Sequence, residues 1–64
     1  MKTYFDVLQL LKRFGVFIYT GDRNTDLELM LTEVKDLFEN GLLMKEDYLV
    51  AVLILRQQMS NTSK

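Results

Sequence analysis

Cysteine and histidine are both absent from this sequence of 64 residues. Without cysteine the chain can form no disulfide bond and offers no thiolate ligand for zinc. Without histidine it lacks the side chain best suited to proton transfer near neutral pH, and the imidazole that commonly binds metals. A domain this small and without such links must gain its stability from helix packing or from oligomerisation. The lack of cysteine also fits a reducing compartment such as the cytoplasm.

Long hydrophobic runs are missing as well. The longest unbroken apolar segment covers residues 48–55, which is eight residues, whereas a membrane-spanning helix needs about 20. Near the N-terminus, Asp6 and Gln9 interrupt the apolar run that a secretory signal needs, and no small-residue cleavage site follows. We therefore expect a cytoplasmic protein with no membrane partner.

The remaining composition is typical of one globular domain. Apolar residues make up 48% of the sequence and charged residues 27%, which separates it from disordered chains. The first helical pattern covers residues 4–14, preceded by Thr3 and Asp6 as a weak capping box and followed by Gly15 as a left-handed cap. Its apolar stripe consists of Tyr4, Val7, Leu8, Leu11 and Phe14, widened by Phe5 and Leu10.

Two further helices follow. The second begins at Asp22, Asn24 or Thr25, all competent N-caps, and ends at Asn40-Gly41. The third begins near Lys45, and residues 48–55 are apolar on every side, so this helix is either buried all round or shared between the domain and a partner. We therefore predict an all-α fold, a small three-helix bundle with an extended connector between helices one and two. Residues 1–59 form this single domain, and residues 60–64 form a frayed polar tail.

The connector is the segment between the first two helices, residues 15–23. Its centre is apolar, aromatic or β-branched, which favours an extended backbone, yet no second strand pattern is present for it to pair with. Alternate side chains of an extended segment point in opposite directions, with Val16, Ile18 and Thr20 on one side and Phe17 and Tyr19 on the other. If both rings are buried and Arg23 is tied to a carboxylate, the connector is only a structural clasp.

Two segments of the chain carry a resemblance to a known family. The opening Tyr4-Phe5-Asp6-Val7-Leu8-Gln9-Leu10-Leu11-Lys12 and the connector string Phe17-Ile18-Tyr19-Thr20-Gly21-Asp22-Arg23 are similar to the YqgQ family of short bacterial proteins. The match continues through residues 26–28, 41–42, 45–47 and 53–57, and is weakest in helix two. The resemblance implies a cytosolic three-helix bundle. It also implies single-stranded nucleic-acid binding as the suggested activity, and it brings no catalytic motif.

Charge is distributed unevenly along the chain, although the net charge is −1. Residues 1–25 hold four cations and two acids, a net of +2, whereas residues 26–47 hold seven acids and two cations, a net of −5. The N-terminal part thus offers a modest basic patch beside aromatic rings, the combination that binds single strands. The candidate nucleic-acid-binding residues are Lys12, Arg13, Phe17, Tyr19 and Arg23, with Tyr4 as a further ring. In the competing interpretation these rings fill the core, and the cations cap helix one or pair with Asp22 and Asp26.

Other functions have less support in the sequence. Asp22, Asp26 and Glu28 lie near the start of the second helix, where they are better explained as caps than as catalytic acids. Their spacing does not match a calcium loop, and a single glycine does not make a phosphate-binding loop. We therefore expect no enzymatic activity, no cofactor and no metal. The alternative to nucleic-acid binding is a protein–protein interaction or homodimerisation module that uses helix three and the connector.

Overall fold

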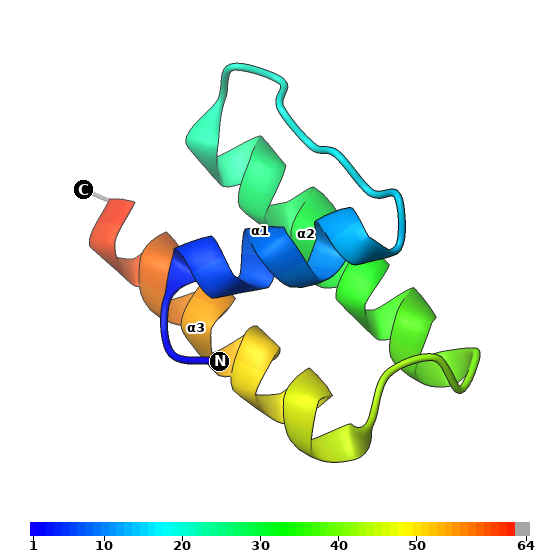
Figure 1. Cartoon of the computed structure of the whole chain (residues 1–64). Helices are drawn as coiled ribbons and strands as arrows, with labels where there is room; N and C mark the ends of the chain where they lie inside the picture. The colour runs from blue at the N-terminus through cyan, green and yellow to red at the C-terminus, as the bar shows by residue number, and fades with distance from the viewer. Residues whose placement is uncertain (63–64) are drawn as a thin grey trace.

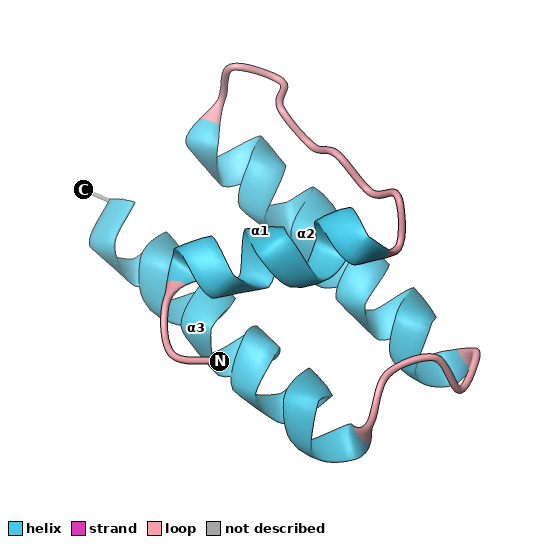
Figure 2. Ribbon diagram, viewed as in Figure 1, coloured by secondary structure: helices cyan, strands magenta, loops and turns pink. Residues whose placement is uncertain are grey.

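Three helices joined by two links make up the fold. The computed structural model describes residues 1–62, with α1 at Tyr4–Arg13, α2 at Arg23–Glu39 and α3 at Lys45–Thr62 (Figure 1). Within those residues there is no strand, and the connector is an irregular link without a pairing partner (Figure 2). The predicted all-α three-helix bundle is therefore confirmed.

The N-terminus of α1 is fixed by a reciprocal capping box. The Thr3 hydroxyl accepts a hydrogen bond of 3.3 Å from the Asp6 N–H, and the Asp6 carboxylate accepts from the N–H groups of Lys2 at 2.8 Å and Thr3 at 3.1 Å. These N–H groups favour the charged carboxylate and hold the pKa of Asp6 below its ordinary value, and the N–H of Lys2 has the largest effect. The weak capping box that the sequence predicts is thus complete in the structure.

Glycines end the first two helices by the same pair of hydrogen bonds. Gly15 has φ +78°, its N–H donates to the Lys12 carbonyl, and the Val16 N–H donates to the Leu11 carbonyl. Gly41, with φ +76°, ends α2 in the same way. This pattern satisfies carbonyls that the helix leaves without partners, and it needs a left-handed residue that glycine adopts without strain. The cap residue after α1 is Phe14, so the helix ends one residue before the predicted boundary.

Asp22 is the N-cap of α2. Its carboxylate accepts hydrogen bonds from the Thr25 hydroxyl and from the Thr25 N–H, the latter at 3.1 Å. Both hydrogen bonds lower the pKa of Asp22, and the bond from the Thr25 hydroxyl has the larger effect. Of the three starting points that the sequence leaves open, the earliest is therefore the one used.

The core lies where α1 crosses the pair formed by α2 and α3 (Figure 1). All three helices and the second link contribute buried apolar side chains, which are Val7, Leu11, Leu27, Met30, Val34, Leu37, Leu43, Ala51, Ile54 and Leu55. Beside the link that joins α2 to α3, the rings of Phe38 and Tyr48 stack with their centroids 4.4 Å apart. This core fixes α1 and α2, the two helices that hold the connector.

α3 is buried on one side only. Ala51 and Leu55 are fully buried, whereas Leu49 and Leu53 are 53% and 58% exposed. The interpretation that α3 is buried all round is therefore wrong, because one side of the helix is exposed. α3 continues to Thr62, so residues 60–62 of the predicted tail are helical, while residues 63–64 lie outside the described residues. Across residues 1–62, no helix combines the length and apolar content that crossing a membrane requires.

Candidate nucleic-acid interface

A buried carboxylate holds the connector against α2. Asp26, only 7% exposed, accepts two hydrogen bonds on Oδ1 from Thr20, one from its N–H at 2.8 Å and one from its hydroxyl at 2.7 Å. A buried carboxylate is stable only when such donors replace water. Val16 and Ile18 also pack against the core from the same side of the connector. We call the two bonds between Thr20 and Asp26 the clasp.

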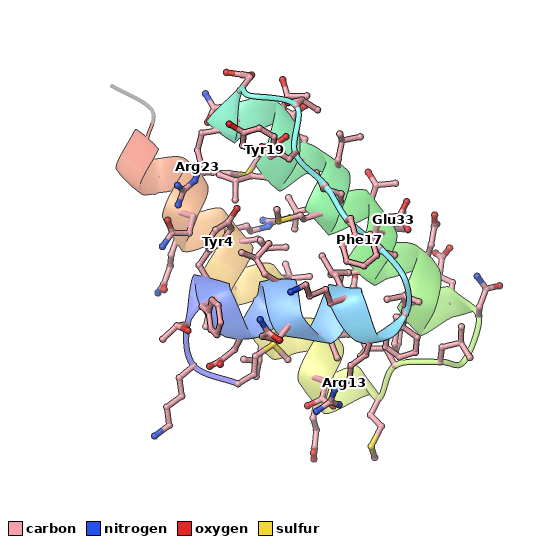
Figure 3. All side chains as sticks on the ribbon, turned by 45° about the horizontal axis from the view of Figure 1, so that its top comes forward. Tyr4, Arg13, Phe17, Tyr19, Arg23 and Glu33 are labelled. Atoms are coloured by element: carbon pink, nitrogen blue, oxygen red, sulfur yellow. The ribbon has the colours of Figure 1, made fainter. Side chains whose placement is uncertain are left out.

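The two aromatic residues between these anchors face solvent. Phe17 is 73% exposed and Tyr19 is 89% exposed, as expected if an extended segment alternates its side chains. Figure 3 shows both rings on the connector, on the side of α1 opposite to Arg13. The interpretation that these two rings fill the core is therefore wrong, and they remain available to a ligand.

These rings line an open groove between α1 and the connector. The groove has a volume of about 420 Å³. Leu8, Val16 and Ile18, which pack against the core, form its apolar base. The other lining residues are Phe5, Gln9, Lys12, Phe17 and Tyr19. Three exposed rings and one ammonium group thus line one surface.

Arg13 lies on a different surface. It lines a second hollow with Asp6, Gln9 and Asp47, in which two carboxylates accompany the one guanidinium. Its side chain projects from the far side of α1 with respect to Phe17 (Figure 3). The structure thus brings together Lys12, Phe17 and Tyr19 from the predicted set but not Arg13.

Arg23 makes contacts within the protein. Its guanidinium lies over the ring of Tyr4, 4.5 Å from the ring centroid, and donates a hydrogen bond to the Gln58 side-chain oxygen. This cation–π contact covers one face of the Tyr4 ring, which is half-buried. Neither partner of Arg23 is a carboxylate, so the predicted ion pair with Asp22 or Asp26 is not the contact it makes. Arg23 instead ties the start of α2 to α3.

Phe5 is the groove residue that the sequence interpretation misses. Its spacing predicts a place in the apolar stripe of helix one, but its side chain is 62% exposed. At 100° per residue, Phe5 lies about 110° from the centre of the stripe formed by Tyr4, Val7, Leu8 and Leu11. That angle was the available signal that Phe5 sits at the edge of the buried face. Among the described residues, no three acidic side chains come close enough together to hold a metal ion.

The chain matches known proteins over nearly its whole length. Residues 1–61 match the family described as YqgQ-like. The chain belongs to this family. It is also similar to a Bacillus subtilis (strain 168) protein named "Uncharacterized protein YqgQ", with 44% identity over 62 residues that cover 97% of this chain and 87% of the relative. The resemblance inferred from the sequence is thus confirmed, and since neither description states an activity, the function must be argued from the groove.

Proposed function

We propose that this YqgQ-like protein is a cytoplasmic, non-enzymatic module that binds single-stranded nucleic acid weakly in the groove between α1 and the connector. The observation that supports this proposal is the exposure of Phe17 and Tyr19 beside Lys12 in one open groove. Large exposed rings clustered around an apolar base are unusual on a protein surface and point to a ligand with flat apolar faces.

Stacking supplies most of the proposed affinity. Each base that stacks on an aromatic side chain contributes about 1–3 kcal/mol, and Phe5, Phe17 and Tyr19 provide three rings at the groove. Bases in a duplex already stack on each other, so only an unpaired strand offers them to these rings. The groove therefore favours single strands over duplexes.

Electrostatics contributes little to the proposed affinity. Lys12 is the one cation among the residues that line the groove, and the whole chain has a net charge of −1. Each phosphate contact on a single strand gives a slope of about −0.7 in log K against log salt. We therefore expect a slope close to that of a single contact, far from the steep dependence of proteins that bind chiefly through phosphates.

Fluorescence anisotropy with a labelled single-stranded oligonucleotide tests the proposal. Tyr19→Ala and Phe17→Ala should each weaken binding about tenfold, the loss of roughly one stacked base. Lys12→Ala should remove most of the salt dependence. Arg13→Ala is the matched control for charge, because Arg13 lies outside the groove.

Two outcomes contradict the proposal. One is the absence of an anisotropy change for the unmodified protein at low salt and high protein concentration. The other is binding that responds to Arg13→Ala but to neither aromatic variant, which would show that general charge rather than stacking holds the strand. The four exposed sites should leave the far-UV circular dichroism spectrum unchanged, so lost binding is not confused with unfolding.

Protein binding is the second candidate function, and α3 supplies the observation that favours it. Leu49 and Leu53 are more than half exposed on a helix whose opposite side, at Ala51 and Leu55, is fully buried. A pull-down from lysate with and without nuclease distinguishes nucleic-acid binding from direct protein binding. Partners lost on nuclease treatment indicate a nucleic-acid role, and partners retained indicate direct protein contact.

A further inference from the structure

The exposed face of α3 carries a pattern that is complementary to itself. Glu46, Leu49, Leu53 and Arg56 follow each other at intervals of three, four and three residues, so they lie along one side of the helix. This side is opposite Ala51, which is fully buried. All four residues are exposed. We call this row the α3 seam.

The seam is symmetric about the level of residue 51. Leu49 and Leu53 are each two residues from that level, and Glu46 and Arg56 are each five residues from it. When two copies of α3 lie antiparallel, Leu49 of one copy meets Leu53 of the other, and Glu46 meets Arg56. A parallel pair would instead place Glu46 against Glu46 and Arg56 against Arg56. The charge pattern therefore fits a two-fold, antiparallel pair, in which the same patch serves both subunits.

We propose that the α3 seam is the interface of a weak antiparallel homodimer. α1 and α2 pack against the side of α3 that holds Ala51, Ile54 and Leu55, which leaves this row on the opposite side for a second copy. Neither Glu46 nor Arg56 forms an ion pair with another side chain that the structure describes. Two apolar side chains flanked by opposite charges is also the layout of an interface with an apolar centre and a polar rim.

The size of the seam determines how strong this dimer is. From Glu46 to Arg56 the helix rises about 15 Å, and two leucines per copy supply the apolar centre. Such a contact falls below the area of about 1,200 Å² that stable interfaces bury, which places it among transient associations. The α3 seam shares no residue with the groove between α1 and the connector, so this inference does not depend on nucleic-acid binding.

Sedimentation equilibrium of the full chain tests the proposal, from micromolar concentrations up to about 1 mM, the range of a transient contact. The apparent mass should rise towards twice the 7.6 kDa of one chain. Leu53→Glu should raise the dissociation constant at least about tenfold, because it buries a charge at the apolar centre. Leu29→Glu is the matched control, since Leu29 is 43% exposed on α2 and should leave association unchanged. An unmodified protein that stays monomeric at the highest concentration overturns the proposal.

Exchange of the two charges tests the antiparallel direction. Glu46→Arg alone and Arg56→Glu alone each set like charges against each other at both ends of the two-fold interface, and each should weaken association several-fold, up to about thirtyfold for two exposed pairs. The double variant Glu46→Arg/Arg56→Glu restores opposite charges and should return close to the original dissociation constant. A double variant as weak as the single variants overturns the proposed pairing.

A mixing experiment controls for folding. The Glu46→Arg and Arg56→Glu variants, each weak alone, should associate when mixed in equal amounts, because all facing charges are then opposite. No association in the mixture, with both variants helical by circular dichroism, overturns the proposal. Leu53→Glu should still bind the labelled oligonucleotide as the unmodified protein does. Failure of dimerisation and failure of nucleic-acid binding are therefore read out separately.

Discussion

The clasp between Thr20 and Asp26 is expected to contribute a measurable part of the folding free energy. Thr20→Val keeps the shape of the side chain and the backbone N–H but removes the hydroxyl that lies 2.7 Å from Asp26 Oδ1. A hydrogen bond to a charged group contributes about 1.5–3 kcal/mol net. The N–H bond of 2.8 Å remains, and Thr20 is exposed, so water can replace part of the lost bond. We therefore expect a loss of about 1–2 kcal/mol.

That loss is large for a domain of this size. At about 0.05–0.15 kcal/mol per residue, the whole chain is stable by about 3–10 kcal/mol. For small domains each kcal/mol shifts the midpoint of thermal unfolding by about 4–8 °C, so Thr20→Val should lower it by about 4–16 °C. Urea unfolding followed by far-UV circular dichroism measures the free energy directly, through the midpoint at constant slope.

Conservative variants separate the effect of the Thr20 hydroxyl on stability from that of the Asp26 charge. Thr20→Ser keeps the hydroxyl and should remain much closer to the unmodified protein than Thr20→Val. Asp26→Asn keeps Oδ1 as the acceptor of both bonds but removes the charge, so it should lose less stability than Asp26→Ala. The reasoning is refuted if Thr20→Val unfolds within about 0.5 kcal/mol of the unmodified protein, the range of ordinary surface substitutions, or if Thr20→Ser and Thr20→Val are equally destabilised.

Two further predictions concern the helix ends. The pKa values of Asp6 and Asp22 are depressed below 3.8 in the folded protein, so their contribution to stability is present above that pH and is lost as the pH falls through the lower folded values. The midpoint temperature of thermal unfolding should therefore fall below about pH 4. Asp22→Asn should reduce this dependence on pH. Gly41→Ala forces alanine into φ +76° and should destabilise by about 1–2 kcal/mol in urea unfolding, whereas Gly41→Asn should lose less, since asparagine tolerates this conformation.

The helix ends were the most predictable part of the fold, because each depends on residues close together in sequence. Gly15 and Gly41 mark the ends of two helices through their backbone conformation alone. The start of α2 was not decided by the sequence, because Asp22, Asn24 and Thr25 all have short polar side chains that can cap. The structure selects Asp22, whose carboxylate reaches both donors of Thr25. Capping residues thus predict that a helix begins, but a cluster of them does not predict where.

The candidate site was predictable only in part, because it depends on how α1 is rotated in the bundle. The alternation of the connector correctly placed Phe17 and Tyr19 together on one side. Lys12 and Arg13 are neighbours in sequence, yet successive residues of a helix point about 100° apart, and they line different surfaces. A count of charges along a segment therefore overestimates a basic patch. The clasp itself was missed, because nothing in the sequence distinguishes a buried Asp26 from the other acids near the start of α2.

The connector serves two purposes through one conformation. Val16 and Ile18 anchor it to the core, and the clasp fixes its far end, so the residues between must project the other way. The exposed rings of Phe17 and Tyr19 bury little surface, and exposed substitutions of this kind change stability by no more than about 0.5 kcal/mol. Folding therefore does not account for two aromatic residues at these positions, where polar residues would fold as well. Because the anchors hold the backbone extended, the rings are already placed at the groove before any ligand arrives, which reduces the entropy lost on binding.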